Sequence, residues 1–193
     1  RSRGLGDVYK RQIPSSSQHL NCNIEGIGFD TSKNMWVLKT SDTEMNFDVI
    51  CFAIAPYQIS KILLTLTNKQ REVLDSIPYA SSAIFHFGFK SSQIPNKPNA
   101  VGFIVPNREH KHFIACSFVS DKYENRAPND HILIRAFAGG ALQEDQLTIP
   151  VQELRNKILN ELKSILQIQG EPIIEDYAMW PKSMPQYLSL IHI

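Results

Sequence analysis

The stretch that decides the fold class spans residues 131–170 and reads HILIRAFAGGALQEDQLTIPVQELRNKILNELKSILQIQG. Its first part, residues 131–137, is short and apolar, which predicts a strand. In its second part, residues 149–167, one helical stripe carries Val151, Leu154, Ile158, Leu162 and Ile165. Thr148 is the expected N-cap, and Gly170 is expected to end the helix. A strand is therefore followed by a long amphipathic helix.

The segments before and after this stretch complete the pattern. Residues 19–29 and 34–40 flank a polar turn and predict a hairpin. Residues 47–54 form a nearly continuous apolar run, which predicts a strand buried on both faces. Two short helices are expected between residues 59 and 77. Further strands are expected at 80–90, 101–105, 111–119 and 172–180, the first three forming an antiparallel meander with 131–137. This order of strands and helices indicates an α+β fold.

Composition excludes several classes of protein. The 193 residues are 42% hydrophobic and 20% charged, with a formal net charge of +1. That charge balance lacks the excess of basic residues typical of proteins that bind nucleic acid. No apolar run is long enough for a transmembrane helix. The three cysteines are Cys22, Cys51 and Cys116, with no CxxC among them. We expect them to be buried, reduced thiols, which favours a reducing compartment.

The two ends of the chain are related through DNA. Residues 7–12 read DVYKRQ and residues 188–193 read LSLIHI. Codons GAT GTG TAT AAG AGA CAG encode the first segment, and the reverse complement of those codons encodes the second. The shared element resembles the transposon end used in sequencing libraries. We therefore expect residues 1–12 and 188–193 to be adapter-derived and to project from the fold.

The residues alone point to no reaction. The spacing of His110 and His112 suits two metal ligands, but no third ligand is suggested nearby, which favours solvated turn residues. The period of two predicts that His86 faces away from its phenylalanine neighbours as a half-exposed sheet histidine. Arg135 either faces a solvated side of the sheet or binds a carboxylate. Gly139-Gly140 is expected to form a plain turn. We name no catalytic residue and no metal site.

Four segments carry a resemblance to a known family. They read FDVICFAIAP at 47–56, VGFIVP at 101–106, RAP at 126–128 with HILIRAFAGG at 131–140, and WPKSMPQY at 180–187. In this order and spacing the chain resembles the oxygen-dependent protoporphyrinogen or coproporphyrinogen oxidases of haem biosynthesis, in the FAD-containing amine-oxidase superfamily. The resemblance covers almost all of residues 13–187.

The resemblance implies a fragment of a two-domain FAD-dependent oxidase with an antiparallel substrate-domain sheet. It implies that residues 13–56 are part of the FAD-binding domain and residues 57–171 the substrate-binding domain, with residues 172–187 returning toward the FAD domain. Implied FAD contacts are Ile24, Ala55, Pro56 and Trp180. Implied substrate contacts are Ala80, Val101 and Gly102.

The resemblance also implies partners and a location. The implied partners are a porphyrinogen and O2. The implied location is cytoplasmic, and peripheral contact to the inner membrane is implied for a region of the family that this sequence does not include. The N-terminal GxGxxG of the family is absent as well. We therefore expect this fragment neither to hold FAD stably nor to turn over.

Two alternatives stay open. One is another amine-oxidase-type flavoenzyme, such as a carotenoid desaturase or an amine oxidase. It would share Ile24 and Ala55-Pro56 but not the RAP segment or the MPQY end. The other is a non-enzymatic, hydrophobe-binding α+β domain with no cofactor.

Overall fold

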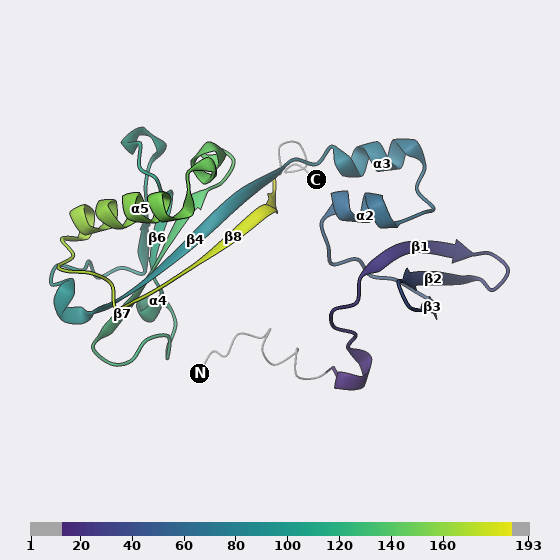
Figure 1. Cartoon of the computed structure of the whole chain (residues 1–193), viewed down its shortest axis with the longest axis horizontal. Coiled ribbons are helices and arrows are strands. Elements are labelled where there is room, and N and C mark those ends of the chain that lie inside the picture. The colour runs from purple at the N-terminus through teal and green to yellow at the C-terminus, as the bar shows by residue number, and fades with distance from the viewer. Residues whose placement is uncertain (1–12, 187–193) are drawn as a thin grey trace. The chain divides into compact units, whose positions relative to one another are not determined.

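The computed structural model describes residues 13–186, and the chain divides into two compact units (Figure 1). The first unit ends at Ile77 and the second begins at Pro78. This division falls later than the boundary expected at Pro56. The adapter-derived ends expected at 1–12 and 188–193 lie outside the described residues.

The first unit contains a three-stranded antiparallel sheet. Its strands are β1 (Ile24–Asp30), β2 (Met35–Thr40) and β3 (Glu44–Phe47), in that spatial order. The expected hairpin is β1–β2. Its turn is held by Asp30, whose Oδ1 accepts the backbone N–H of Ser32 at 2.9 Å, and by Asn34, which adopts a left-handed φ of 53°. Local turn chemistry therefore sets this pairing.

Two short helices follow the sheet. They are α2 (Pro56–Ile62) and α3 (Asn68–Asp75). The chain between them returns to the sheet, because the N–H of Leu64 donates to the carbonyl of Ile27 at 2.8 Å. Thr67 caps α3 in a capping box with Gln70, as its sequence position suits.

The prediction of a buried strand at residues 47–54 is wrong. Strand β3 ends at Phe47, and residues 48–55 form neither strand nor helix. Val49 is 79% exposed. An apolar run becomes a buried strand only when neighbouring strands accept and donate its backbone hydrogen bonds. No strand among residues 13–186 pairs with this segment.

The second unit is built on a five-stranded antiparallel sheet. The strands are β4 (Tyr79–Lys90), β5 (Gly102–Ile104), β6 (Ala115–Phe118), β7 (His131–Gly139) and β8 (Ile174–Pro185). Their spatial order is β5-β6-β7-β4-β8. The expected antiparallel pairing is confirmed, and β5, β6 and β7 are neighbours in chain order, as in a meander. The expected position of β4 is wrong, because β4 pairs with β7 and not with β5. Strand β8 pairs with β4 and extends past Trp180.

One face of this sheet packs against the long helix α5 (Val151–Leu166) (Figure 1). Strand β4 contributes Phe85, Phe87 and Phe89 to the core, and α5 contributes the apolar stripe predicted from its spacing. The buried members of that stripe are Leu154, Ile158 and Leu162. The expected α+β class is confirmed.

The helix ends differ from the sequence prediction. The N-cap is Pro150, while the Thr148 hydroxyl donates to the carbonyl of Asp145 at 2.7 Å in the preceding 3₁₀ helix. The helix ends at Leu166 because Gln167 turns left-handed, with φ 53°. Gly170 lies in the loop beyond.

The cysteines differ in exposure. Cys116 on β6 is buried, but Cys22 and Cys51 are exposed, so the expectation of three buried thiols is wrong. All three are free thiols.

Candidate functional site

The face of the five-stranded sheet opposite α5 is the candidate site, and we call it the open face. Side chains alternate along each strand, so the residues between the core positions all point to it. On β4 and β7 the core positions are fully buried, while the open-face positions are half-buried. The open face is therefore the side of the sheet from which a partner or ligand can approach.

Strand register arranges the open face in rows. One row crosses all five strands and joins Gly102, Ser117, Arg135, His86 and Asp176. We call it the polar row. The row on one side of it is apolar and consists of Ile104, Ala115, Phe137, Ile84 and Ala178. The row on the other side contains Leu133, Gly88 and Ile174. A single polar row thus lies between two apolar rows.

At the centre of the polar row, Arg135 contacts His86. The Arg135 Nε donates to Nε2 of His86 at 3.0 Å. Because Nε2 accepts, the proton of the neutral ring is on Nδ1. Burial lowers the pKa of His86, and the Arg135 cation lowers this pKa further, against the opposing charge of Asp176. Burial and the Arg135 cation therefore both favour the neutral form of the ring.

The remaining polar atoms of this pair have few partners. Nδ1 of His86 is buried and has no hydrogen-bond partner among residues 13–186. No carboxylate in that range forms an ion pair with Arg135. The guanidinium lies 6.0 Å from the ring centroid of Phe137, which supports it through a cation–π contact.

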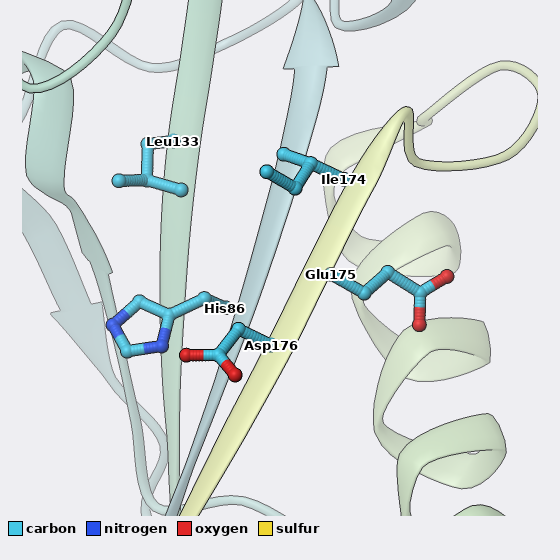
Figure 2. A pocket seen from close by; sticks show the side chains of 5 residues that line it. All are labelled: His86, Leu133, Ile174, Glu175 and Asp176. Carbon is cyan, nitrogen blue, oxygen red and sulfur yellow. The ribbon is translucent and has the colours of Figure 1, made fainter.

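A small cavity of about 240 Å³ lies at one end of the row, lined by His86, Leu133, Ile174, Glu175 and Asp176. Figure 2 shows the His86 ring and the Asp176 carboxylate on the same side of the sheet. The Glu175 side chain points the other way, toward α5, where Arg155 Nε donates to its Oε2 at 2.7 Å (Figure 2). The cavity wall is thus mostly apolar, with one imidazole and one carboxylate.

The expected FAD contacts are divided between the two units. Ile24 is half-buried at the start of β1, and Ala55 and Pro56 lie at the start of α2. Trp180 lies on β8 in the second unit, 51% exposed on the open face opposite Ser82.

The expected substrate contacts lie at two places on the second sheet. Ala80 is on β4 and only 3% exposed. Val101 is 58% exposed just before β5, and its carbonyl accepts the N–H of Phe118 at 2.9 Å. Strands β6 and β7 separate these two positions. Gly102 lies in the polar row.

Gly102 also has a structural role. A Cβ at this position would lie 2.3 Å from the carbonyl oxygen of Cys116 and 2.9 Å from the Cα of Ser117. The missing side chain therefore permits the close approach of β6, whether or not a ligand is bound.

Sequence reasoning placed some of these residues correctly. His86 lies half-buried on the face away from the core, as its period predicts. Asp176 was not anticipated, because its proximity to His86 depends on the pairing of β8 with β4, and no local signal in either strand specifies that pairing.

His112 differs from the expectation of a solvated turn residue. It is half-buried, and Glu161 of α5 accepts its backbone N–H at 3.0 Å and lies 2.8 Å from its Nδ1. His110 is exposed, as expected. Within the described residues no three side chains gather in a way that suits a metal ion. Nor does any helix of residues 13–186 have the length and apolar character needed to cross a membrane.

Comparison with known proteins gives consistent matches. The family model described as flavin containing amine oxidoreductase matches residues 3–188. Coproporphyrinogen III oxidase of Bacillus subtilis (strain 168) is 28% identical over 206 residues, which cover 97% of this chain and 44% of that protein. Protoporphyrinogen oxidase 2, chloroplastic/mitochondrial, of Arabidopsis thaliana is 25% identical over 121 residues, covering 61% of this chain and 24% of that protein. The chain thus spans less than half the length of these relatives.

A crystal structure provides a match in three dimensions. It is that of a candidate protoporphyrinogen oxidase from Exiguobacterium sp. 255-15, with a TM-score of 0.77 at 22% identity. The match covers 95% of this chain and 40% of that one. This likeness shows the fold.

Proposed function

Because this chain belongs to the flavin containing amine oxidoreductase family, we propose that the whole protein is an FAD-dependent porphyrinogen oxidase. In each oxidation step the macrocycle loses a hydride and a proton, and O2 takes both and becomes hydrogen peroxide. FAD, when bound, would supply the redox chemistry that links the macrocycle to O2. The matched relatives named as coproporphyrinogen and protoporphyrinogen oxidases support this substrate class.

The open face is the observation that carries the proposal. A porphyrinogen is a wide, mostly apolar macrocycle with carboxylates only at its rim. Sites for such ligands are largely apolar with a few placed polar groups. The open face offers this pattern, because rows containing Ile84, Phe137 and Leu133 lie on either side of the polar row. Its residues bind and orient the macrocycle, and we assign none of them an acid–base role.

The described residues fit part of the FAD molecule. Ile24, Ala55 and Pro56 offer apolar surface, and the neighbouring segment 48–55 carries further exposed apolar side chains. These groups suit the flat rings of the cofactor. None is a glycine-rich loop or a cation that could hold the pyrophosphate. We propose that these residues and Trp180 contact the rings of FAD.

The parts of the chain then have different roles. We propose that residues 13–56 belong to the FAD-binding domain and residues 57–171 to the substrate-binding domain, with residues 172–187 returning toward the FAD domain. We place Gly102, Val101 and Ala80 near the substrate. The position of Gly102 in the polar row supports its assignment. A cytoplasmic location with peripheral contact to the inner membrane stays a prediction.

Anaerobic flavin reduction tests the proposed function. The whole protein, with FAD bound, is mixed without O2 with coproporphyrinogen III, protoporphyrinogen IX or putrescine. We expect a porphyrinogen to bleach the flavin absorbance, and admission of air to restore it with formation of hydrogen peroxide and fluorescent porphyrin. Reduction by putrescine and by neither porphyrinogen would refute the proposal in favour of an amine oxidase.

A variant on the open face sharpens this test. Ile84→Glu places a carboxylate in the apolar row, where the macrocycle would lie. Glu153→Gln on the exposed side of α5 is the matched control. We expect Ile84→Glu to slow porphyrinogen-dependent bleaching at least tenfold while FAD content stays unchanged, and the control to behave as wild type. Equal bleaching rates in all three proteins would exclude the open face as the substrate wall.

A further inference from the structure

We propose that Arg135 binds a rim carboxylate of the tetrapyrrole and that His86 holds its guanidinium in position for this contact. This inference rests on the proposed function and assigns the polar anchor of that site. Arg135 is the binding residue, and His86 is a positioning residue.

The first argument concerns charge. Arg135 is a permanent cation on a half-buried, largely apolar sheet face. A ligand that covers this face removes water from the cation, and a charge taken out of water is costly unless a counter-charge pairs with it. Residues 13–186 provide no such counter-charge, since no carboxylate there lies within ion-pair distance of Arg135. The nearest acidic position in the polar row, Asp176, is separated from Arg135 by the neutral ring of His86. The missing anion is therefore expected from a ligand.

The second argument concerns the donors. A guanidinium has five N–H groups, and the Nε–H of Arg135 is used by His86. The terminal NH2 groups have no hydrogen-bond partner among the described residues. These terminal groups match the geometry of a carboxylate, which can accept from them as a pair. The contacts with His86 and Phe137 restrict the guanidinium, so less side-chain freedom is lost on binding.

The third argument concerns space. On the β6 and β5 side of Arg135 the polar row continues with Ser117 and Gly102, which are small. Ala115 lies diagonally beside them. Small residues on this side of Arg135 would not block a carboxylate that approaches the guanidinium, while the apolar rows would lie against the macrocycle. A tetrapyrrole with propionate side chains offers both a carboxylate for Arg135 and an apolar ring for the neighbouring rows.

The test compares an acid with its ester on the whole protein. The ligands are coproporphyrin III and its tetramethyl ester, which has the same ring but no charged carboxylate. Dissociation constants are measured from porphyrin fluorescence for wild type, Arg135→Met, and Arg108→Met. Arg108 is the matched control, because its side chain is 84% exposed and is on neither face of the sheet. Thermal melts confirm that each variant is folded.

We expect Arg135→Met to weaken binding of the acid by about 10- to 100-fold, as for a charged hydrogen bond. Binding of the ester should change less than about twofold, and Arg108→Met should change neither. Unchanged affinity for the acid, or equal weakening of acid and ester, would overturn the inference. A variant that melts at lower temperature but keeps its affinity would also overturn the inference, because it would show that Arg135 stabilises the sheet through His86 and Phe137 and does not bind the ligand.

His86 is tested by rescue. His86→Leu removes the acceptor for the Arg135 Nε–H and should abolish most of the preference for acid over ester. His86→Gln retains an acceptor oxygen and should restore that preference. If both variants lose it equally, His86 does not position Arg135. If wild-type protein binds neither porphyrin, the proposed function itself fails. If it binds both and Arg135→Met has no effect, only this inference fails.

Discussion

Two adjacent glycines at the end of β7 should differ in their tolerance of a methyl group. Gly139 and Gly140 have φ angles of 81° and 80°, so alanine at either position pays the left-handed penalty of about 1–2 kcal/mol. At Gly140 the new Cβ meets only Ile114 Cδ1, at 3.6 Å. At Gly139 it would lie 2.9 Å from the carbonyl oxygen of Ser81 and 2.7 Å from Leu147 Cδ1. Overpacking of this kind costs a further 1–3 kcal/mol, roughly.

We therefore expect Gly140→Ala to lower the free energy of unfolding by about 1–2 kcal/mol and Gly139→Ala by about 2–5 kcal/mol. Urea unfolding of the 193-residue chain measures both. A Trp36→Phe background leaves Trp180 as the only tryptophan, so its fluorescence follows the second unit alone. Equal losses for the two variants would refute the packing argument, because they share the same backbone penalty.

Three further outcomes follow from single features. Burial raises the pKa of Cys116 to about 12, so a thiol reagent at pH 8 should label Cys22 and Cys51 in the native chain and Cys116 only after unfolding; rapid labelling of all three would contradict this. Thr67→Ala removes the cap of α3 and should destabilise the first unit by about 1 kcal/mol, measured by Trp36 fluorescence in a Trp180→Phe background. An unchanged free energy of unfolding would contradict the role of this cap. Because burial and Arg135 lower the pKa of His86, the unfolded state binds more protons below the usual value of 6.5, so stability falls as pH drops through that range. In urea unfolding at pH 7 and 5.5, His86→Gln should lose less stability than wild type, and an equal loss would argue against the assigned shift.

Local patterns predicted the elements that depend on local interactions. The residues of the apolar stripe of α5 lie close to one another in the sequence, and so do the residues of the polar turn between β1 and β2. Both elements formed where expected. Residues 48–55 show the opposite case. Their composition suits a buried strand, but a strand needs partners for its backbone, and residues 13–186 supply none there.

The polar row of the candidate site could not be read from the sequence for a related reason. Ser117, Arg135, His86 and Asp176 come from four strands, and each looks ordinary in its own segment. Only the register between distant strands places them together. The period of two predicted the face on which His86 lies, but not its neighbour on β7.

The position of β4 in the sheet has a consequence for how the chain folds. Its partners are β7 and β8, so Phe85 pairs with Ala136 and with Tyr177, far along the chain. During synthesis β4 emerges long before either partner, with three phenylalanines that have nothing to pack against. Pairing over such sequence separations is slow because the intervening loop must close first. The centre of this sheet therefore leaves the ribosome before its two neighbours do, and the phenylalanines of β4 stay without their native contacts until β7 and β8 have been synthesised.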